Sequence, residues 1–239
     1  LKKLLSKFIE IKFEKNKVKF LNSSTKTFHR IKSIYTKEIL TIEWIKKFKK
    51  NSIFWDVGAN IGIFSLYAAC VPKVKVLSFE PMPSNYKNLC VNISTNKLSD
   101  KIIPFCLVLN DKNILSNLYV KWLEEGFSGT SFGKQLEISH KNGLNIKQFS
   151  LSIDTLVYKL GLPLPNYLKI DIDGNDFLVL KGAKKVLKNK QLRSIMIESP
   201  SRNLKNAEKK IKTFLKNYDL IFSKKENKNL FFEKKKKYK

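Results

Sequence analysis

Carboxylates that follow two apolar runs are the residues of this chain best suited to chemistry. Asp171 and Asp173 come directly after one run, and Glu80 ends another, which covers residues 74–79. A carboxylate beside a bound hydroxyl can take its proton, and an acid at the tip of a parallel strand can accept hydrogen bonds from both hydroxyls of a ribose. These residues predict a site that holds a nucleoside beside a general base.

A turn punctuated by glycines would complete such a site. Apolar residues run into Asp56, Gly58 and Gly62 follow, and an amphipathic stretch covers residues 63–71. This pattern predicts a strand, a tight loop and a helix, as in nucleotide-binding α/β folds. Two glycines after a strand are common in such folds. The prediction of a nucleotide site therefore depends on the order of Asp56, Gly58, Gly62 and Glu80 along the predicted elements.

Asn60 narrows the choice of nucleotide. It occupies the place where dinucleotide-binding motifs have a second glycine, and its side chain would obstruct a pyrophosphate. A phosphate-binding Gly-x-x-x-x-Gly-Lys-Ser/Thr loop is absent from the sequence. S-adenosylmethionine, which has no phosphate, fits these residues: its ribose suits Glu80, and its carboxylate and amine suit the loop at the helix start.

Residues 37–232 resemble the FkbM-type S-adenosylmethionine-dependent methyltransferases. The resemblance rests on Trp55-Asp56-Val57-Gly58-Ala59-Asn60-Ile61-Gly62, Phe79-Glu80-Pro81, Ser152-Ile153-Asp154-Thr155, Leu168-Lys169-Ile170-Asp171-Ile172-Asp173-Gly174, Leu180-Lys181-Gly182-Ala183 and Ile197-Glu198. It implies methylation of a hydroxyl on a small molecule, either a sugar or glycan or a natural-product precursor. Residues expected to bind the donor are Asp56, Gly58, Ala59, Asn60, Gly62, Glu80, Pro81 and Met82.

Three residues are candidates for the chemical step. Asp171 is expected to take the hydroxyl proton, or alternatively to hold the amine of the donor. Asp173 is the second candidate for the base, and Lys169 would orient a carboxylate or offset its charge. The family often has glutamate where this chain has Asp173 and Asp176, so roles do not transfer directly to these two positions.

No metal site is predicted. Asp171, Asp173 and Glu198 could gather a hard divalent cation, but the sequence lacks a spacing that is typical of such sites. A metal-free reaction is therefore the favoured hypothesis.

The predicted fold is α/β: a doubly wound, mostly parallel seven-stranded sheet with an antiparallel C-terminal strand, as in Rossmann-like class I methyltransferases. Residues 36–233 would form this domain, residues 1–35 an accessory extension with a β-hairpin, and residues 234–239 a solvated basic tail. We expect single helices over 36–48 and 176–187, and one strand over 102–109. Asp154 would cap a short helix.

Residues 123–148 are predicted to be a long loop because they hold Gly126, Gly129, Gly133 and Gly143 among polar residues. Loops of this length in a compact domain are usually functional or disordered, and we expect this one to close over the acceptor. His140 lies in it and is expected to be solvated rather than catalytic.

The formal net charge of +27 raises the alternative of nucleic-acid binding. However, only three of the 47 basic residues are arginines, and the lysines are spread along the chain as in proteins of AT-rich genomes. We therefore favour no nucleic-acid partner, although anionic substrates or membrane surfaces would still be attracted. The alternative function is a noncatalytic lysine-rich module that binds RNA or an anionic surface on a methyltransferase-like fold.

The three cysteines, Cys70, Cys90 and Cys106, each lie in an apolar run and have no paired spacing. They indicate reduced thiols and favour a cytoplasmic protein. No stretch of the sequence is apolar enough for a membrane span.

Overall fold

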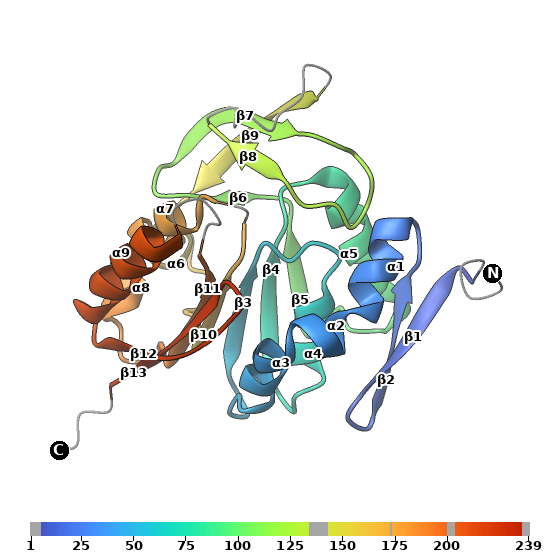
Figure 1. Ribbon diagram of the computed structural model, residues 1–239, viewed down its shortest axis with the longest axis horizontal. Helices are drawn as coiled ribbons and strands as arrows, with labels where there is room; N and C mark the ends of the chain where they lie inside the picture. The colour runs from blue at the N-terminus through green and yellow to red at the C-terminus, as the bar shows by residue number, and fades with distance from the viewer. Residues whose placement is uncertain (1–5, 134–142, 173, 200–203, 236–239) are drawn as a thin grey trace.

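The computed structural model describes residues 6–133, 143–172, 174–199 and 204–235. Its centre is a sheet of seven strands in the order β12-β13-β11-β10-β3-β4-β5 (Figure 1). These are β3 (Ile53–Val57), β4 (Lys75–Phe79), β5 (Ile102–Phe105), β10 (Tyr167–Ile170), β11 (Ser194–Glu198), β12 (Leu220–Glu226) and β13 (Asn229–Lys234). The β3, β4, β5, β10 and β11 pairings are parallel, whereas β13 runs antiparallel to both of its neighbours. The predicted fold class is confirmed.

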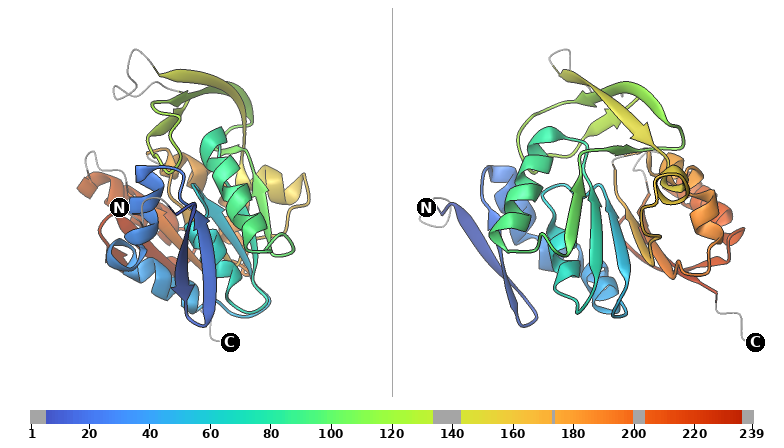
Figure 2. Two further views of the ribbon diagram at one scale, coloured as in Figure 1. Left: turned by 90° about the vertical axis from the view of Figure 1, so that its right-hand side faces the viewer. Right: turned by 180° about the vertical axis from the view of Figure 1, so that it is seen from behind.

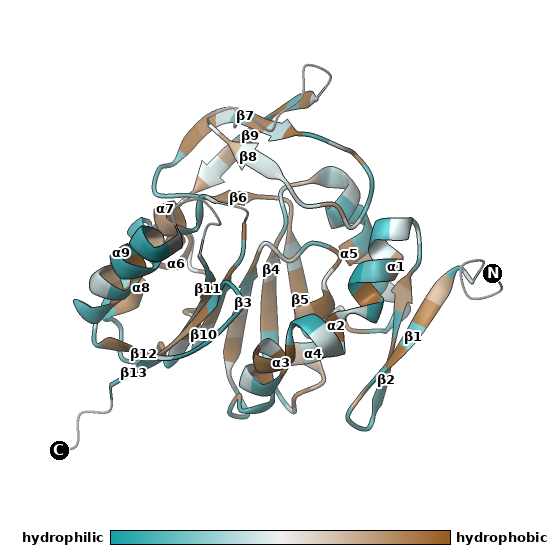
Figure 3. Ribbon diagram, in the orientation of Figure 1, coloured by the Kyte–Doolittle hydropathy of each residue, from teal (hydrophilic) through white to brown (hydrophobic). Residues whose placement is uncertain are grey.

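Helices cover both faces of this sheet (Figure 2). One face carries α3 (Ile39–Lys46), α4 (Ile63–Ala69) and α5 (Pro83–Thr95), and the other carries α6 (Ile153–Tyr158), α7 (Asp176–Lys181), α8 (Lys184–Lys188) and α9 (Leu204–Lys216). Successive strand residues point to opposite faces, so Phe54 joins the first core and Trp55 the second. Figure 3 accordingly shows hydrophobic residues along the middle strands.

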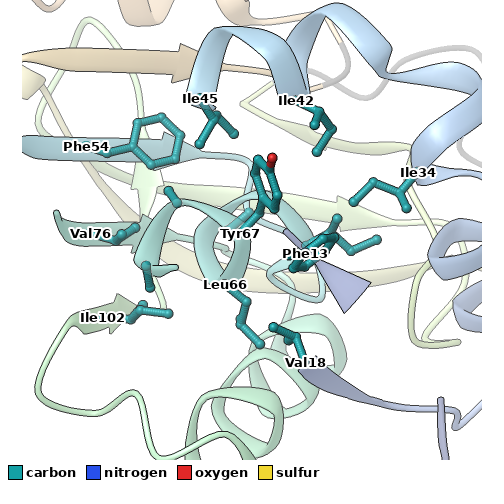
Figure 4. Packing of buried hydrophobic residues seen from close by; sticks show 14 of the residues in the cluster. Phe13, Val18, Ile34, Ile42, Ile45, Phe54, Leu66, Tyr67, Val76 and Ile102 are labelled. Atoms are coloured by element: carbon teal, nitrogen blue, oxygen red, sulfur yellow. The ribbon is translucent and has the colours of Figure 1, made fainter. Parts of the chain in front are cut away.

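The N-terminal hairpin packs on the first face. Strands β1 (Phe8–Phe13) and β2 (Asn16–Leu21) pair antiparallel, as predicted. Phe13 is fully buried, and its ring centroid lies 4.6 Å from that of Tyr67 in α4. Figure 4 shows side chains from the hairpin, the sheet and helices α3 and α4 meeting in this core: Phe13, Val18, Ile42, Ile45, Phe54, Leu66, Tyr67, Val76 and Ile102. The hairpin therefore caps the core.

Two predicted helices are each broken in two. Instead of one helix over 36–48, α2 (Ile34–Lys37) ends before Glu38, which precedes α3. The Glu38 carboxylate accepts hydrogen bonds from Asn229 Nδ2 (2.8 Å) and Thr41 Oγ1 (3.1 Å), contacts that helical periodicity alone does not reveal. The helix predicted for 176–187 breaks around Gly182, where a Cβ would lie 2.3 Å from the Asn110 carbonyl oxygen.

A second sheet replaces part of the predicted loop. Its order is β6-β9-β7-β8, and its strands are β6 (Val108–Leu109), β7 (Ile114–Val120), β8 (Thr130–Phe132) and β9 (Leu144–Leu151). The prediction of a loop over 123–148 is thus wrong at β8 and β9, and the strand predicted for 102–109 divides between two sheets. Strand β8 has only three residues and lies among glycines, and β9 is mostly polar, so neither segment gives a clear strand signal in the sequence. His140 lies outside the described residues.

The second sheet lies beyond the carboxyl ends of the central strands (Figures 1 and 2). Between the hairpin and α2, residues 25–32 form a helix, α1 (Thr25–Lys32), which the sequence analysis left without structure. Within the described ranges, no helix combines the length and apolar character needed to cross a membrane.

Candidate functional site

Three segments meet at the carboxyl ends of β3, β4 and β10. Strand β3 lies between the other two, and the turn after it is bonded to both neighbours. The amides of Gly58 and Ala59 donate to the Phe79 carbonyl at 2.9 and 3.0 Å, and the amide of Asp171 donates to the Val57 carbonyl at 3.0 Å. The turn, Glu80 and Asp171 are therefore brought to one edge of the sheet, as predicted.

The glycines of the turn allow close packing of the protein on itself. Gly58 has φ +79°, and a Cβ there would lie 1.8 Å from the Asp171 carbonyl oxygen. Gly62 has φ +88°, and its Cβ would lie 2.4 Å from Leu89 Cδ1. Both positions require glycine for a left-handed conformation and for close contact with the neighbouring element. These requirements hold whatever ligand binds.

Glu80 is held in one orientation at the end of β4. Its Oε2 accepts from the Asn60 amide (2.8 Å) and its Oε1 accepts from the Met82 amide (2.9 Å). The residue is only 5% exposed. Burial raises the pKa of Glu80 to about 7, although the two backbone hydrogen bonds, Asn85 and the Arg30 charge lower it in part.

Lys169 connects two carboxylates in the interior. Its Nζ lies 3.1 Å from Asp56 Oδ1 and 3.3 Å from Asp171 Oδ2. Burial lowers the pKa of Lys169, but the two carboxylates raise it more strongly, so the net shift is upward and the amine stays protonated. The Asp171 side chain is 33% exposed, whereas Asp56 is fully buried and also accepts from Ser65 Oγ at 2.6 Å.

Two hollows adjoin at this edge. The outer hollow, of about 400 Å³, lies between α1, the β3 turn and residues 126–128; its lining includes Lys26, His29, Arg30, Glu38, Lys169 and Asp171. The inner hollow, of about 180 Å³, shares Arg30, Glu38 and Asp171 and adds Glu80, Pro81, Asn85, Thr130 and Glu198. Beside them is an apolar slot formed partly by Phe79, Val108, Leu109 and Phe132.

The structure distributes the predicted site residues among these places. Gly58, Ala59, Asn60, Lys169 and Asp171 line the outer hollow, and Glu80 and Pro81 line the inner one. Asp56 and Met82 instead point into the interior: Asp56 is bonded to Lys169 and Ser65, and Met82 packs with Val108, Leu118 and Phe132. Asp173 lies outside the described residues.

Of the three acids considered for a cation, Asp171 and Glu198 both line the inner hollow, and Asp173 lies outside the described residues. Across the described ranges, no three histidine, cysteine, aspartate or glutamate side chains gather as a metal site would require.

Several residues at the hollows were missed by sequence reasoning. Lys26, His29 and Arg30 come from α1, and Glu38 precedes α3. Burial and the neighbouring Asp171 raise the pKa of Glu38. The signal that could have revealed α1 is the N-cap Ser24, whose side chain accepts from the Thr27 amide, followed by the buried Ile31.

Residues 125–127 connect α1 to the turn after β3 and to α5. The Phe127 carbonyl accepts from Asn60 Nδ2 and Asn85 Nδ2, both at 3.0 Å. The Gly126 amide donates to Asn85 Oδ1 at 2.8 Å, and the Gly126 carbonyl accepts from Arg30 Nε at 3.0 Å. This segment therefore connects the β3 turn, α5 and α1 around the hollows.

Comparison with known proteins places this chain in a family. A family model described as "Methyltransferase FkbM domain" matches residues 56–222. The chain is 25% identical over 171 residues to "Hexuronic acid methyltransferase AglP" from Haloferax volcanii, covering 72% of this chain and 66% of that protein. It is 39% identical over 61 residues to "tRNA (guanine(37)-N(1))-methyltransferase" from Batrachochytrium dendrobatidis, covering 26% of this chain and 13% of that protein.

A solved structure shares the fold. Methyltransferase FkbM from Methylobacillus flagellatus KT superposes with a TM-score of 0.55 at 14% identity, covering 88% of this chain and 51% of that chain. The chain spans less than two thirds of the length of each of these three proteins. Because the family model matches well over half of the sequence, the chain belongs to the FkbM methyltransferase family.

Proposed function

We propose that this protein is an S-adenosylmethionine-dependent methyltransferase that methylates a hydroxyl oxygen on a sugar, a glycan or a natural-product precursor. The observation that carries the proposal is the shared hollow between Glu80 and Asp171. Both carboxylates line it, from the ends of β4 and β10, with the glycine turn after β3 between them. Ligands of doubly wound sheets bind at such carboxyl ends, where the strand order reverses.

The residues fit the donor. Glu80 is buried and oriented by two backbone amides, which leaves a fixed carboxylate for the hydroxyls of a ribose. The apolar slot beside Phe79 and Val108 holds only about 30 Å³, so an adenine ring would have to widen it. The turn at Gly58 and Asn60 flanks the place for the amino-acid portion. The Asn60 side chain, bonded to the Phe127 carbonyl, occupies space that a pyrophosphate would need.

Asp171 would serve as the base. When bound, S-adenosylmethionine supplies a methyl group activated by its sulfonium charge, so the protein must mainly align the acceptor and remove its proton. The Asp171 side chain is partly exposed to the outer hollow, and its Oδ2 forms an ion pair with the buried Lys169 Nζ. The alternative role for Asp171 is to hold the donor amine.

Asp171→Asn separates these roles. As a base, Asp171 would contribute about 10²–10⁴-fold to kcat, while the affinity for S-adenosylhomocysteine would stay within about twofold. As an amine ligand, its loss would weaken S-adenosylhomocysteine instead. Calorimetry and transfer of labelled methyl to a panel of uronic and neutral sugars measure both. Asp100→Asn, an exposed carboxylate away from the hollows, is the matched control. Unchanged kcat and affinity in Asp171→Asn, or no binding of S-adenosylhomocysteine to the wild type, would refute the proposal.

Sugar acids are the first acceptors to test. The Haloferax volcanii relative is named a hexuronic acid methyltransferase, and its similarity extends over most of this chain. The tRNA methyltransferase is similar only over 61 residues, so it supports the shared core alone.

We also propose that residues 125–128 close over the bound acceptor. Phe127 and Ser128 line both hollows, and hydrogen bonds hold this segment on three sides. Replacing residues 126–133 with a short linker is expected to abolish methyl transfer, and full activity in that variant would refute the closure.

A further inference from the structure

Helix α1 presents a polar face to the outer hollow. Lys26 and Arg30 are four residues apart, as are His29 and the C-cap residue Ser33, so these residues lie toward one side of the helix. All four line the hollow. The opposite side buries Thr27 and Ile31 against the protein. Packing of this apolar side therefore turns the basic residues toward the site.

Arg30 is informative because arginine is rare here. Lysines are so abundant in this chain that a lysine at any position indicates little, but there are only three arginines. Arg30 is half-buried and lines both hollows, between the Glu80 and Asp171 sides of the site. Among the described residues, Arg30 is the arginine that lines both hollows, where a ligand would lie.

The charges of Lys26 and Arg30 are not used up in ion pairs, although Glu38 and Asp171 line the same hollow. Among the ion pairs of the described residues, none involves Lys26, His29 or Arg30. Arg30 donates from Nε to the Gly126 carbonyl, which leaves its two terminal nitrogens for another partner. Such a planar pair of donors matches a carboxylate in a bidentate arrangement.

This face is built into the fold. Ser24 Oγ donates to the Glu125 carbonyl at 2.6 Å and also caps α1. Gly126 lies so close to the helix that a Cβ would be 2.8 Å from the Thr27 nitrogen. Residues 126 and 127 also form hydrogen bonds with Asn60 and Asn85. These bonds fix the position of α1 relative to the turn after β3.

We propose that Arg30, supported by Lys26 and His29, forms a carboxylate-binding subsite of the methyl-transfer site. Lys37 adds a further cation to the outer hollow, whereas Glu38 and Asp171 face it as carboxylates. This inference rests on the proposed function, and it identifies a carboxylate as the group that the site would bind.

The carboxylate has two sources in this reaction. One is the amino-acid carboxylate of the donor, and the other is the acid of an acidic sugar such as a uronic acid. Each of these carboxylate groups carries one negative charge, and Arg30 could bind either of them in the same way. The experiment therefore has one arm for each source.

The donor arm compares S-adenosylhomocysteine with 5′-methylthioadenosine, which lacks the amino-acid portion. If Arg30 binds the donor carboxylate, Arg30→Gln weakens S-adenosylhomocysteine by about tenfold or more and leaves 5′-methylthioadenosine unchanged. The acceptor arm uses protein saturated with S-adenosylhomocysteine and compares methyl glucuronoside with methyl glucoside. If Arg30 binds the acceptor, the wild type prefers the acid and Arg30→Gln loses that preference.

Three controls keep the test decisive. Lys32→Gln removes a charge from the same helix outside the hollows and should leave both arms unchanged. Arg30→Lys keeps the charge without the fork and should fall between wild type and Arg30→Gln. The side chains of Lys26 and His29 make no hydrogen bond within the part of the chain that the structure describes. The double variant Lys26→Gln with His29→Gln therefore reports on the subsite even if Arg30→Gln is unstable.

Two results would overturn the subsite. One is unchanged ligand affinities, within about twofold, in both arms for Arg30→Gln and for the double variant. The other is an equal loss in Lys32→Gln, which would indicate a diffuse charge effect. A wild type that binds no S-adenosylhomocysteine would instead refute the proposed function itself.

Discussion

Lys169 carries its charge in the interior, between Asp56 and Asp171. A buried ion group of this kind gains little stability over apolar residues, but removal of one partner leaves an uncompensated buried charge. Asp56 would be that charge, since it is fully buried and retains only hydroxyl contacts such as Ser65. Lys169 therefore offsets the charge of two acids, the buried Asp56 and the partly exposed Asp171.

Lys169→Met is expected to lower the free energy of unfolding by about 3–5 kcal/mol. Urea denaturation measures this loss. Lys181→Met is the matched control, because Lys181 pairs with Asp111 at 3.1 Å while 42% exposed, and such pairs contribute about 1 kcal/mol or less. Equal losses in the two variants would contradict the interior role of Lys169.

Two buried carboxyl groups predict how stability depends on pH. Burial raises the pKa of Glu80 to about 7 and that of Asp176 to about 7, each partly offset by backbone hydrogen bonds. The folded protein therefore holds protons that the unfolded chain releases. The stability from these groups is fully present below their ordinary pKa values and is lost as the pH rises toward 7.

Urea denaturation from pH 5 to pH 8 at constant ionic strength tests this sign. Other carboxylates also contribute, so the informative quantity is the difference between wild type and Glu80→Gln, whose amide does not titrate. The wild type should lose stability relative to the variant with rising pH, by up to about 1.4 kcal/mol per pH unit. A constant difference would show that Glu80 titrates normally.

At the scale of elements, the turn after β3 was predicted correctly but for an incomplete reason. Its glycines suggested a cradle for a ligand, whereas Gly58 first of all admits the Asp171 carbonyl. Register and strand order determine that contact, and neither can be obtained from the residues of the turn alone. The same limit explains the helix break at Gly182, which depends on the distant Asn110.

Gly58→Ala should be far more damaging than Gly161→Ala. Both glycines have positive φ, +79° and +74°, so alanine meets a similar conformational penalty of about 1–2 kcal/mol at each. Only at Gly58 would the added Cβ overlap another backbone atom, whereas at Gly161 nothing lies within 4 Å. We expect a loss of at least about 3 kcal/mol at Gly58. Thermal denaturation compares the two variants, and similar melting temperatures would refute the close contact.

The second sheet marks where sequence reasoning about elements failed. The inner strands β3, β4, β10 and β11 of the central sheet are largely apolar and β-favouring, and the apolar runs of the sequence located them. Strand β9, by contrast, mixes Asn145, Lys147 and Gln148 with exposed Phe149, because only part of its surface packs against the protein. Its pairing with β7 in antiparallel register stabilises it, and that partner is distant in sequence.

At the scale of the whole molecule, the net positive charge is not concentrated at the candidate site. Lysines occur on the hairpin, on most helices and on the outer strands, so the net charge of +27 is spread rather than gathered into one groove. The basic residues of α1 line the outer hollow, because contacts with residues 125–127 fix the position of that helix. Overall charge alone could not have distinguished them.

This distribution predicts nonspecific binding to RNA. A diffuse set of lysines binds phosphates by counterion release, so affinity for single-stranded poly(U) should fall steeply between 50 and 200 mM salt, by about 300-fold if six phosphates are contacted. S-adenosylhomocysteine carries no net charge at neutral pH, so its affinity should change by less than about threefold over the same range. Fluorescence anisotropy and calorimetry measure the two ligands on the same protein. RNA binding that persists at high salt with a base preference, together with no binding of S-adenosylhomocysteine, would favour the noncatalytic module instead, because that pattern requires a dedicated RNA surface and an empty donor site.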